Sequence, residues 1–143
     1  MSDAWRLFIE NSARMQTALD ERLRASDGMS LSDYHVLLLL SEAPDRRLRM
    51  RELSERMVFS ASRLTYQVDV LAKRGWLCRE PVPGDRRGAY ACLTDDGLAA
   101  FDVAARHHGS DVDALFHSAI SPDDEAALGA VMRRIATNLE EHR

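Results

Sequence analysis

The segment from Leu48 to Thr94 constrains the fold most, because a helical apolar pattern passes there into a pattern of two short strands. In the helical part, Leu64, Val68 and Leu71 recur at i, i+4 and i+7 and form one apolar face. The opposite face carries hydroxyl, amide, guanidinium and phenol groups in place of the Lys and Glu of an ordinary surface helix. Such groups donate to phosphates and read base edges, so the pattern predicts a helix that contacts nucleic acid.

The candidate DNA contacts of the helical segments lie on this helix and shortly before it. Ser60 is expected to cap the first turn, so that backbone N–H groups at the helix start can bind a phosphate. Gly75 is expected to end the helix, and Arg49 is a phosphate contact ahead of the preceding short helix. The predicted contacts are Arg49, Ser60, Ser62, Arg63, Thr65, Tyr66, Gln67 and Lys73.

Residues 76–80 and 89–93 have the composition of two strands in a hairpin, joined by a loop at 81–88. Pro81 and Pro83 cannot donate to a strand ladder, so pairing is expected to stop where the loop begins. The glycines of the loop allow a sharp turn at its tip.

The tip of this hairpin carries Asp85, Arg86 and Arg87. Arginine on a narrow ribbon can enter a minor groove, where the negative potential is strongest. Asp85 is expected to hold Arg87 in one direction. The hairpin is therefore predicted to be a DNA-binding wing.

Residues 85–94, with the sequence DRRGAYACLT, fit the D-x-R-x(5)-L-T wing signature of the MarR (multiple antibiotic resistance regulator) transcription factors. The chain resembles this family in three further places. Residues 31–40 are similar to its second helix, 51–57 to its third helix, and 68–75 to the end of its recognition helix. The resemblance implies a homodimeric repressor or activator of transcription, often released from DNA by a small phenolic or lipophilic ligand.

The same resemblance implies a ligand pocket between the first, second and fifth helices, where the dimerisation helices meet the DNA-binding module. Met15, Tyr34 and His35 fall on these helices and are the candidate pocket residues. By itself, a histidine within an apolar helix such as His35 is more typical of a hydrogen-bonded core residue than of a sensor.

The expected fold class is mainly α with a small β-hairpin wing, as a winged helix-turn-helix with long N- and C-terminal dimerisation helices. The chain is expected to be a single domain over 1–143, with a DNA-binding module at 30–94 and dimerisation helices at 1–28 and 95–143. In detail, the sequence predicts helices at 4–25, 32–41 with Ser32 as cap, 50–57, 95–118 and from 122 onward, a strand at Leu48, and the helix-turn-helix turn at 58–60.

Apolar stripes on the terminal helices predict an obligate homodimer, because a compact winged module does not need these helices to bury its own core. A two-fold dimer presents two recognition helices to successive major grooves. The predicted partner is therefore double-stranded DNA with an inverted-repeat operator, whose half-sites lie about 10 bp apart.

A net charge of −4 is unusual for a nucleic-acid binder, but the charge is unevenly distributed. Residues 44–90 carry eleven Lys and Arg against six Asp and Glu, whereas the remainder carries eight against seventeen. The central segment is therefore attracted to phosphate. No apolar run has the length of a membrane span, and two cysteines do not make a disulfide framework, so a cytoplasmic location is expected.

The two cysteines, Cys78 and Cys92, lie at similar distances from the hairpin tip and are expected to be cross-strand neighbours. One alternative is a redox-responsive regulator in which these thiols form a disulfide that loosens DNA. Two small buried hydrophobic residues are the commoner interpretation of such a pair.

Metal-binding, catalytic and protein-binding functions have less support in the sequence than DNA binding does. His107 and Asp111 have the i, i+4 spacing of a metal pair, but a surface pair, with His108 at the dimer seam, is the favoured interpretation. No catalytic motif, metal site or cofactor site is predicted. A winged-helix module that binds another protein is a further alternative, against which Arg63, Arg86 and Arg87 together favour DNA.

Overall fold

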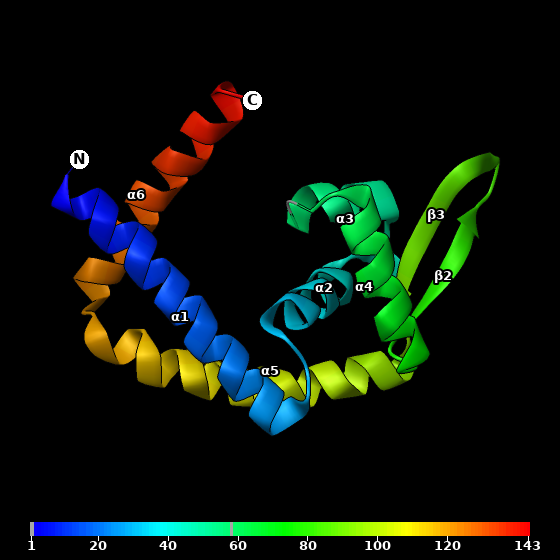
Figure 1. Cartoon of the computed structure of the whole chain (residues 1–143), viewed down its shortest axis with the longest axis horizontal. Helices are drawn as coiled ribbons and strands as arrows, with labels where there is room; N and C mark the ends of the chain where they lie inside the picture. Colours follow the sequence, from blue (N-terminus) through cyan, green and yellow to red (C-terminus); the bar gives the residue numbers. More distant parts are fainter. Residues whose placement is uncertain (1, 58) are drawn as a thin grey trace. The chain divides into compact units, whose positions relative to one another are not determined.

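The computed structural model describes residues 2–57 and 59–143, and it confirms a mostly helical chain with a small three-stranded antiparallel sheet (Figure 1). The α-helices are α1 (Asp3–Asp27), α2 (Leu31–Glu42), α3 (Met50–Met57), α4 (Ala61–Lys73), α5 (Asp95–Leu115) and α6 (Pro122–Glu141). The strands are β1 (Arg47–Arg49), β2 (Leu77–Val82) and β3 (Asp85–Leu93), and the short 3-10 helices are η1 (Pro44–Arg46) and η2 (His117–Ala119).

Two compact units make up the chain, Met1–His108 and Gly109–Arg143, and the boundary between them falls inside α5. The first unit contains the helix-turn-helix and the hairpin. The second contains the end of α5 and all of α6. The finer division into 1–28, 30–94 and 95–143 stays a prediction.

Helix α2 is the centre of the first unit. Val36, Leu37 and Leu40 are fully buried, because α1, α3, β1 and β3 all contact this helix. Helices α3 and α4 form the helix-turn-helix, which packs around α2 (Figure 1). Of the turn expected at 58–60, Val58 lies outside the described residues.

The start of α2 differs from the prediction, because Ser30 caps the helix and Ser32 does not. The Ser30 hydroxyl accepts from the Asp33 backbone N–H at 2.9 Å, and the Asp33 carboxylate accepts from the Ser30 backbone N–H at 3.0 Å. This reciprocal capping box satisfies two backbone donors at once, which a cap at Ser32 does not.

The sheet has the order β1-β3-β2, so that β3 is central and the strand expected at Leu48 is present as β1. The prediction that pairing stops at the prolines was wrong. Pro81 pairs with Ala89 and Val82 with Asp85, because β2 is an edge strand, where a residue without an N–H is tolerated. Gly84 then turns the chain with a φ of 77°, a conformation that glycine adopts without strain.

In the second unit, α5 ends at Leu115, not at 118 as predicted, and residues 117–119 form the 3-10 helix η2. The start of α6 agrees with the sequence: Ser121 and Asp124 form a capping box and Pro122 occupies the first turn. Five large apolar side chains of α6 are exposed in this chain, namely Leu128, Val131, Met132, Ile135 and Leu139.

A tight joint fixes α4, β2 and α5 to one another within the first unit. The backbone N–H of Thr94 donates to the Trp76 carbonyl at 3.0 Å, and the Thr94 hydroxyl donates to the Gly75 carbonyl at 2.6 Å. Gly97, in the first turn of α5, lies so close that an added Cβ would collide with the Trp76 carbonyl. Only glycine allows this approach.

We therefore expect Gly97→Ala to lower the free energy of unfolding by about 1–3 kcal/mol, because a methyl group must push backbone aside. Gly109, also in α5, is the matched control, since a Cβ there meets nothing within 4 Å. Gly109→Ala should raise the free energy of unfolding by up to about 1 kcal/mol through helix propensity. Urea unfolding at one fixed protein concentration measures both, and equal effects of the two substitutions would contradict the prediction.

Candidate nucleic-acid interface

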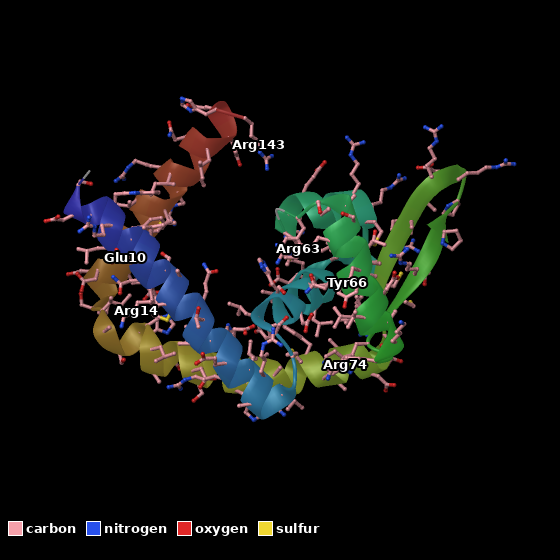
Figure 2. The ribbon with its side chains drawn as sticks, in the orientation of Figure 1. Glu10, Arg14, Arg63, Tyr66, Arg74 and Arg143 are labelled. Carbon is pink, nitrogen blue, oxygen red and sulfur yellow. The ribbon has the colours of Figure 1, made fainter. Side chains whose placement is uncertain are left out.

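Helix α4 presents the polar face that the sequence predicted. The Ser60 hydroxyl accepts from the Arg63 backbone N–H at 3.2 Å and caps the helix as expected. Ser62, Arg63, Thr65 and Tyr66 are all exposed, and Tyr66 is 73% accessible although it is aromatic. Figure 2 labels Arg63 and Tyr66 on this helix. An aromatic ring held out in solvent between hydroxyls and a guanidinium suits contact with a polar, stacked partner such as DNA.

Arg63 has a fixed neighbour on this surface. Its guanidinium lies 3.8 Å from the centre of the Phe59 ring, a cation–π contact that supports the side chain at the start of α4. Arg63 was predicted from the sequence as a contact residue, whereas Phe59 was not. An aromatic residue four positions before an arginine was the signal that could have identified the pair.

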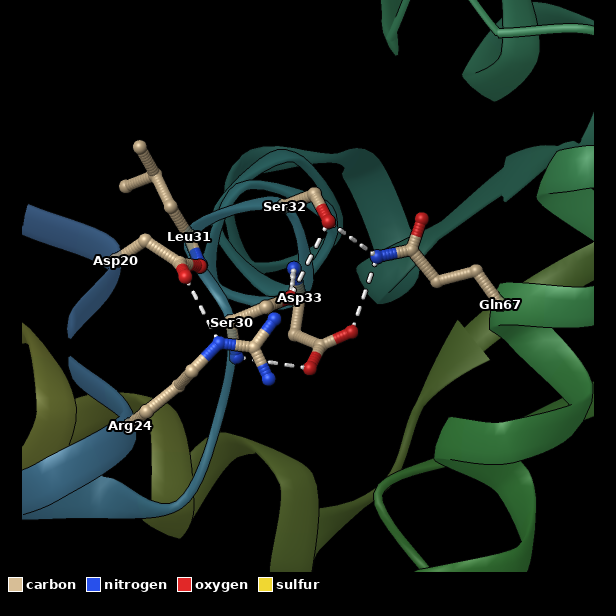
Figure 3. A network of polar contacts seen from close by, with 7 residues as sticks. All are labelled: Asp20, Arg24, Ser30, Leu31, Ser32, Asp33 and Gln67. Atoms are coloured by element: carbon tan, nitrogen blue, oxygen red, sulfur yellow. Dashed lines mark hydrogen bonds and ion pairs between the residues drawn. The ribbon is translucent and has the colours of Figure 1, made fainter. Parts of the chain in front are cut away.

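Gln67 takes a different position from the one the sequence suggested. Its Nε2 donates to the Ser32 hydroxyl and to the Asp33 carboxylate, both at 3.0 Å, so the amide faces the start of α2 (Figure 3). Lys73, also predicted to contact DNA, is exposed at the end of α4. Gln67 therefore ties the predicted recognition helix to α2 in this structure, and its role in DNA contact stays a prediction.

Asp20 of α1 extends this network. One carboxylate oxygen accepts from the Leu31 backbone N–H at 2.8 Å and the other from Arg24 Nε at 2.8 Å (Figure 3). The hydrogen bond from Arg24, followed by the one from Leu31, holds the pKa of Asp20 below its usual value. Polar contacts thus connect α1, the start of α2 and α4, all within the first unit.

The wing tip is organised by Asp85, although not through the Arg87 guanidinium. Asp85 Oδ1 accepts from the backbone N–H of Arg87 at 3.0 Å, and Oδ2 lies 3.2 Å from Arg49 Nη1. Asp85 thereby fixes the Arg87 backbone and holds the Arg49 guanidinium on the side of the wing tip. The Arg86 and Arg87 side chains are exposed, as a groove contact requires.

Arg79 connects the wing to the recognition helix, a role that sequence reasoning missed. Its Nη2 lies 3.1 Å from the Asp69 carboxylate and donates to the Thr65 carbonyl at 3.4 Å. Arg79 is on β2, whereas Asp69 and Thr65 are on α4. The wing and the polar face of α4 are therefore held in one geometry.

Cys78 and Cys92 are directly opposite each other on β2 and β3, as expected for cross-strand neighbours, and both are free thiols. Cys92 is buried. Burial, followed by the influence of Cys78 and Glu80, raises the pKa of the Cys92 thiol to about 12. A thiol that stays protonated is a poor nucleophile, which does not favour the redox alternative.

The histidines differ from expectation. His35 is exposed, so the interpretation of a core histidine was wrong: the residue faces away from the buried side of α2. His107 Nδ1 lies 3.0 Å from the Asp27 carboxylate. The ring of His108 lies 4.4 Å from the ring of Tyr34, centre to centre.

A cleft of about 790 Å³ lies in the first unit between α1, α2 and the start of α4. Of the candidate pocket residues, Tyr34 and His35 line this cleft, whereas Met15 is not among its described lining residues, and a ligand site here stays a prediction. Arg63 and Phe59 form part of the wall from the side of α4. Burial raises the pKa of Tyr34, so its phenol stays a hydrogen-bond donor at neutral pH.

This arrangement of helix-turn-helix and β-hairpin, with a polar α4 face and arginines at the wing tip, defines a winged helix-turn-helix protein. Within the described residues, no helix is both long and apolar enough to cross a membrane.

Similarity to known proteins identifies the family to which the chain belongs. The sequence profile of the MarR family matches residues 27–88. The HTH-type transcriptional regulator YkoM of Bacillus subtilis is 30% identical over 75% of this chain and 68% of its own length. The chain belongs to the MarR family of transcriptional regulators, which confirms the resemblance of its wing and helices.

Two solved structures from Streptomyces coelicolor share the whole fold. AbsC, a MarR family transcriptional regulator, superposes with a TM-score of 0.91 at 31% identity, over 99% of this chain and 97% of AbsC. Sco3205, a MarR family transcriptional regulator crystallised in complex with DNA, has a TM-score of 0.91 at 37% identity, over 95% of this chain and 86% of its own.

Proposed function

We propose that this protein is a sequence-specific repressor that binds an inverted-repeat operator as a homodimer and is released by a small-molecule effector. The observation that carries the proposal is the joining of α4 to the wing by Arg79, which presents the helix face and the wing tip to DNA together. The DNA complex of Sco3205, with its high structural similarity, supports the same use of this surface. The proposed location is the cytoplasm, with the chromosome.

We expect two kinds of DNA contact, one that supplies affinity and one that recognises bases. Arg86 and Arg87 at the wing tip would neutralise phosphates or enter a minor groove, which supplies affinity without reading sequence. Ser62, Arg63 and Tyr66 on α4 would lie in the major groove and read base edges. Arg49, whose guanidinium Asp85 holds, adds a further phosphate contact.

Arg87→Ala should therefore weaken binding to all sequences alike and lower the slope of log K against log salt by about one, because one phosphate contact is lost. Ser62→Ala should instead change which bases are preferred. Fluorescence anisotropy over a salt series, together with selection from a random DNA pool, measures both effects.

Arg106→Ala is the control for these variants, because this exposed arginine of α5 is not among the predicted contacts. It removes the same charge and should leave the salt slope and the preferred sequence as they are. If Arg87→Ala and Ser62→Ala both change the salt slope, or both change the preferred bases, the proposed division between phosphate contacts and base contacts is refuted.

Exposed apolar surface on the terminal helices supports the homodimer. In the first unit, Trp5, Leu7, Phe8 and Ile9 of α1 are between 37% and 61% exposed. In the second unit, the five apolar residues of α6 are between 37% and 64% exposed. Such surfaces are costly in water, and an obligate dimer would bury on the order of 2,000 Å² or more of them.

Ile135→Asp is expected to shift the protein to monomer at micromolar concentration, since a carboxylate would be buried in the proposed interface. Thr137→Asp, which adds the same charge on another side of α6, should leave the dimer intact. Sedimentation equilibrium distinguishes these outcomes. A wild-type monomer at micromolar concentration would refute the homodimer.

The effector is proposed to bind the cleft beside Tyr34 and His35. This cleft combines apolar surface with a phenol, an imidazole and the Arg63 guanidinium, which suits a small phenolic or lipophilic molecule. Because Arg63 belongs both to the cleft and to the α4 face, an occupant that engages its guanidinium competes with DNA for it. This competition links effector binding to release.

We expect phenols or phenolic carboxylates to release operator DNA from the wild-type protein, and His35→Ala to need about tenfold more of the same compound. Met15→Ala is the control, because Met15 lies outside the described cleft lining, and its response should equal that of the wild type. DNA release measured by anisotropy reports the effect. An unchanged response of His35→Ala would place the effector elsewhere.

A further inference from the structure

One face of the sheet gathers sulfur and carboxylate ligands that the proposed function does not use. Cys78 and Cys92 are opposite each other on β2 and β3. Glu80 is two residues along β2 and shares their face, because side chains alternate along a strand. Leu77 and Leu93, on the opposite face, belong to the hydrophobic core.

The three side chains meet at metal-binding distances. The two Sγ atoms and a Glu80 carboxylate oxygen all lie within 4.8 Å of one another. Tetrahedral zinc, with Zn–S bonds of about 2.3 Å, places two sulfurs about 3.8 Å apart. The ligands need to approach by only about 1 Å, which small side-chain rotations provide. We propose that Cys78, Glu80 and Cys92 bind Zn²⁺ at the base of the wing, with water in the fourth position.

Arg47 completes the charge balance of the site. This residue pairs with Cys92 from the other side of β3, and its Nη1 lies 3.1 Å from Glu80 Oε2. Two thiolates and one carboxylate carry three negative charges, so a Zn²⁺ ion leaves one, which the Arg47 guanidinium neutralises. Arg47 also orients the carboxylate, as the outer partners of metal ligands commonly do.

The ligand types select the ion. Thiolates favour zinc and other thiophilic ions, whereas magnesium and calcium require oxygen ligands. The two thiols release their protons when zinc binds, so uptake acidifies an unbuffered solution. Zinc can enter from the solvent side, because Glu80 is exposed and Cys78 is only partly covered.

An ion at this position ties β2 to β3 where the hairpin leaves the core. Zinc would therefore restrict the direction of the wing and, through Arg79, its relation to α4. This consequence rests on the proposed function, whereas zinc binding itself does not.

Cobalt titration of the reduced full-length protein tests the site, with Co²⁺ as the spectroscopic substitute for zinc. The wild type should show thiolate-to-cobalt charge-transfer absorption that saturates at one ion per chain and disappears when Zn²⁺ is added. Cys78→Ser should abolish or at least halve this absorption. Glu80→Gln should weaken zinc affinity at least tenfold, as measured by competition with a chromogenic chelator.

Glu55→Gln is the matched control, because Glu55 is an exposed glutamate of α3 that pairs with an arginine, as Glu80 does. Its zinc affinity should equal that of the wild type. Because Cys92 is buried, the result for Cys92→Ser is used only if circular dichroism shows that this variant is folded. Cys78 is partly exposed, so Cys78→Ser tests the site without relying on Cys92→Ser.

The proposal fails if the reduced protein shows no charge-transfer absorption, if Cys78→Ser leaves it unchanged, or if Glu80→Gln binds zinc as tightly as Glu55→Gln does. It also fails if reduced thiols bind no metal and reoxidise only to a disulfide, as seen in the intact mass. No DNA is present in these assays, so their failure leaves the proposed repressor function unaffected, and loss of DNA binding leaves the zinc site unaffected.

Discussion

Burial of α2 is the constraint on which the first unit depends. Its apolar run is enclosed by α1, α3, β1 and β3, so the helix-turn-helix and the sheet both pack around this one helix. Removing this surface from water is the main favourable term available to a unit of this size. Because α3, α4 and the hairpin all pack on the same core, the proposed DNA-binding surface is supported by buried residues that are not part of it.

The elements that could be predicted from sequence are those that local pattern decides. The buried run of α2, the Ser60 cap, the glycine that ends α4 and the Ser121 start of α6 each depend on neighbours within a few residues. The exposed α4 residues were predictable for the same reason, since helical period assigns them to one side. Misplaced boundaries arose where two local signals competed, as with Ser30 and Ser32 at the start of α2.

Contacts between distant segments could not be predicted. Gln67 turns towards α2 because Ser32 and Asp33 offer it acceptors, and Arg79 reaches Asp69 across the junction of wing and helix. Glu80 lies two residues from Cys78 on β2, and the register of β2 against β3 brings both to Cys92. Each of these depends on a partner ten or more positions away or on a register that composition does not specify.

The joint between Gly97 and Trp76 has a mechanical consequence. No side chain separates the first turn of α5 from the Trp76 carbonyl, and Thr94 is hydrogen-bonded to the carbonyls of both Gly75 and Trp76. Three segments, namely the first turn of α5, the start of β2 and the end of α4, are packed closely at this junction and held together by direct backbone contact. The direction in which the hairpin leaves the core is therefore set in part by the first turn of α5, through a contact that any larger side chain at position 97 would disturb.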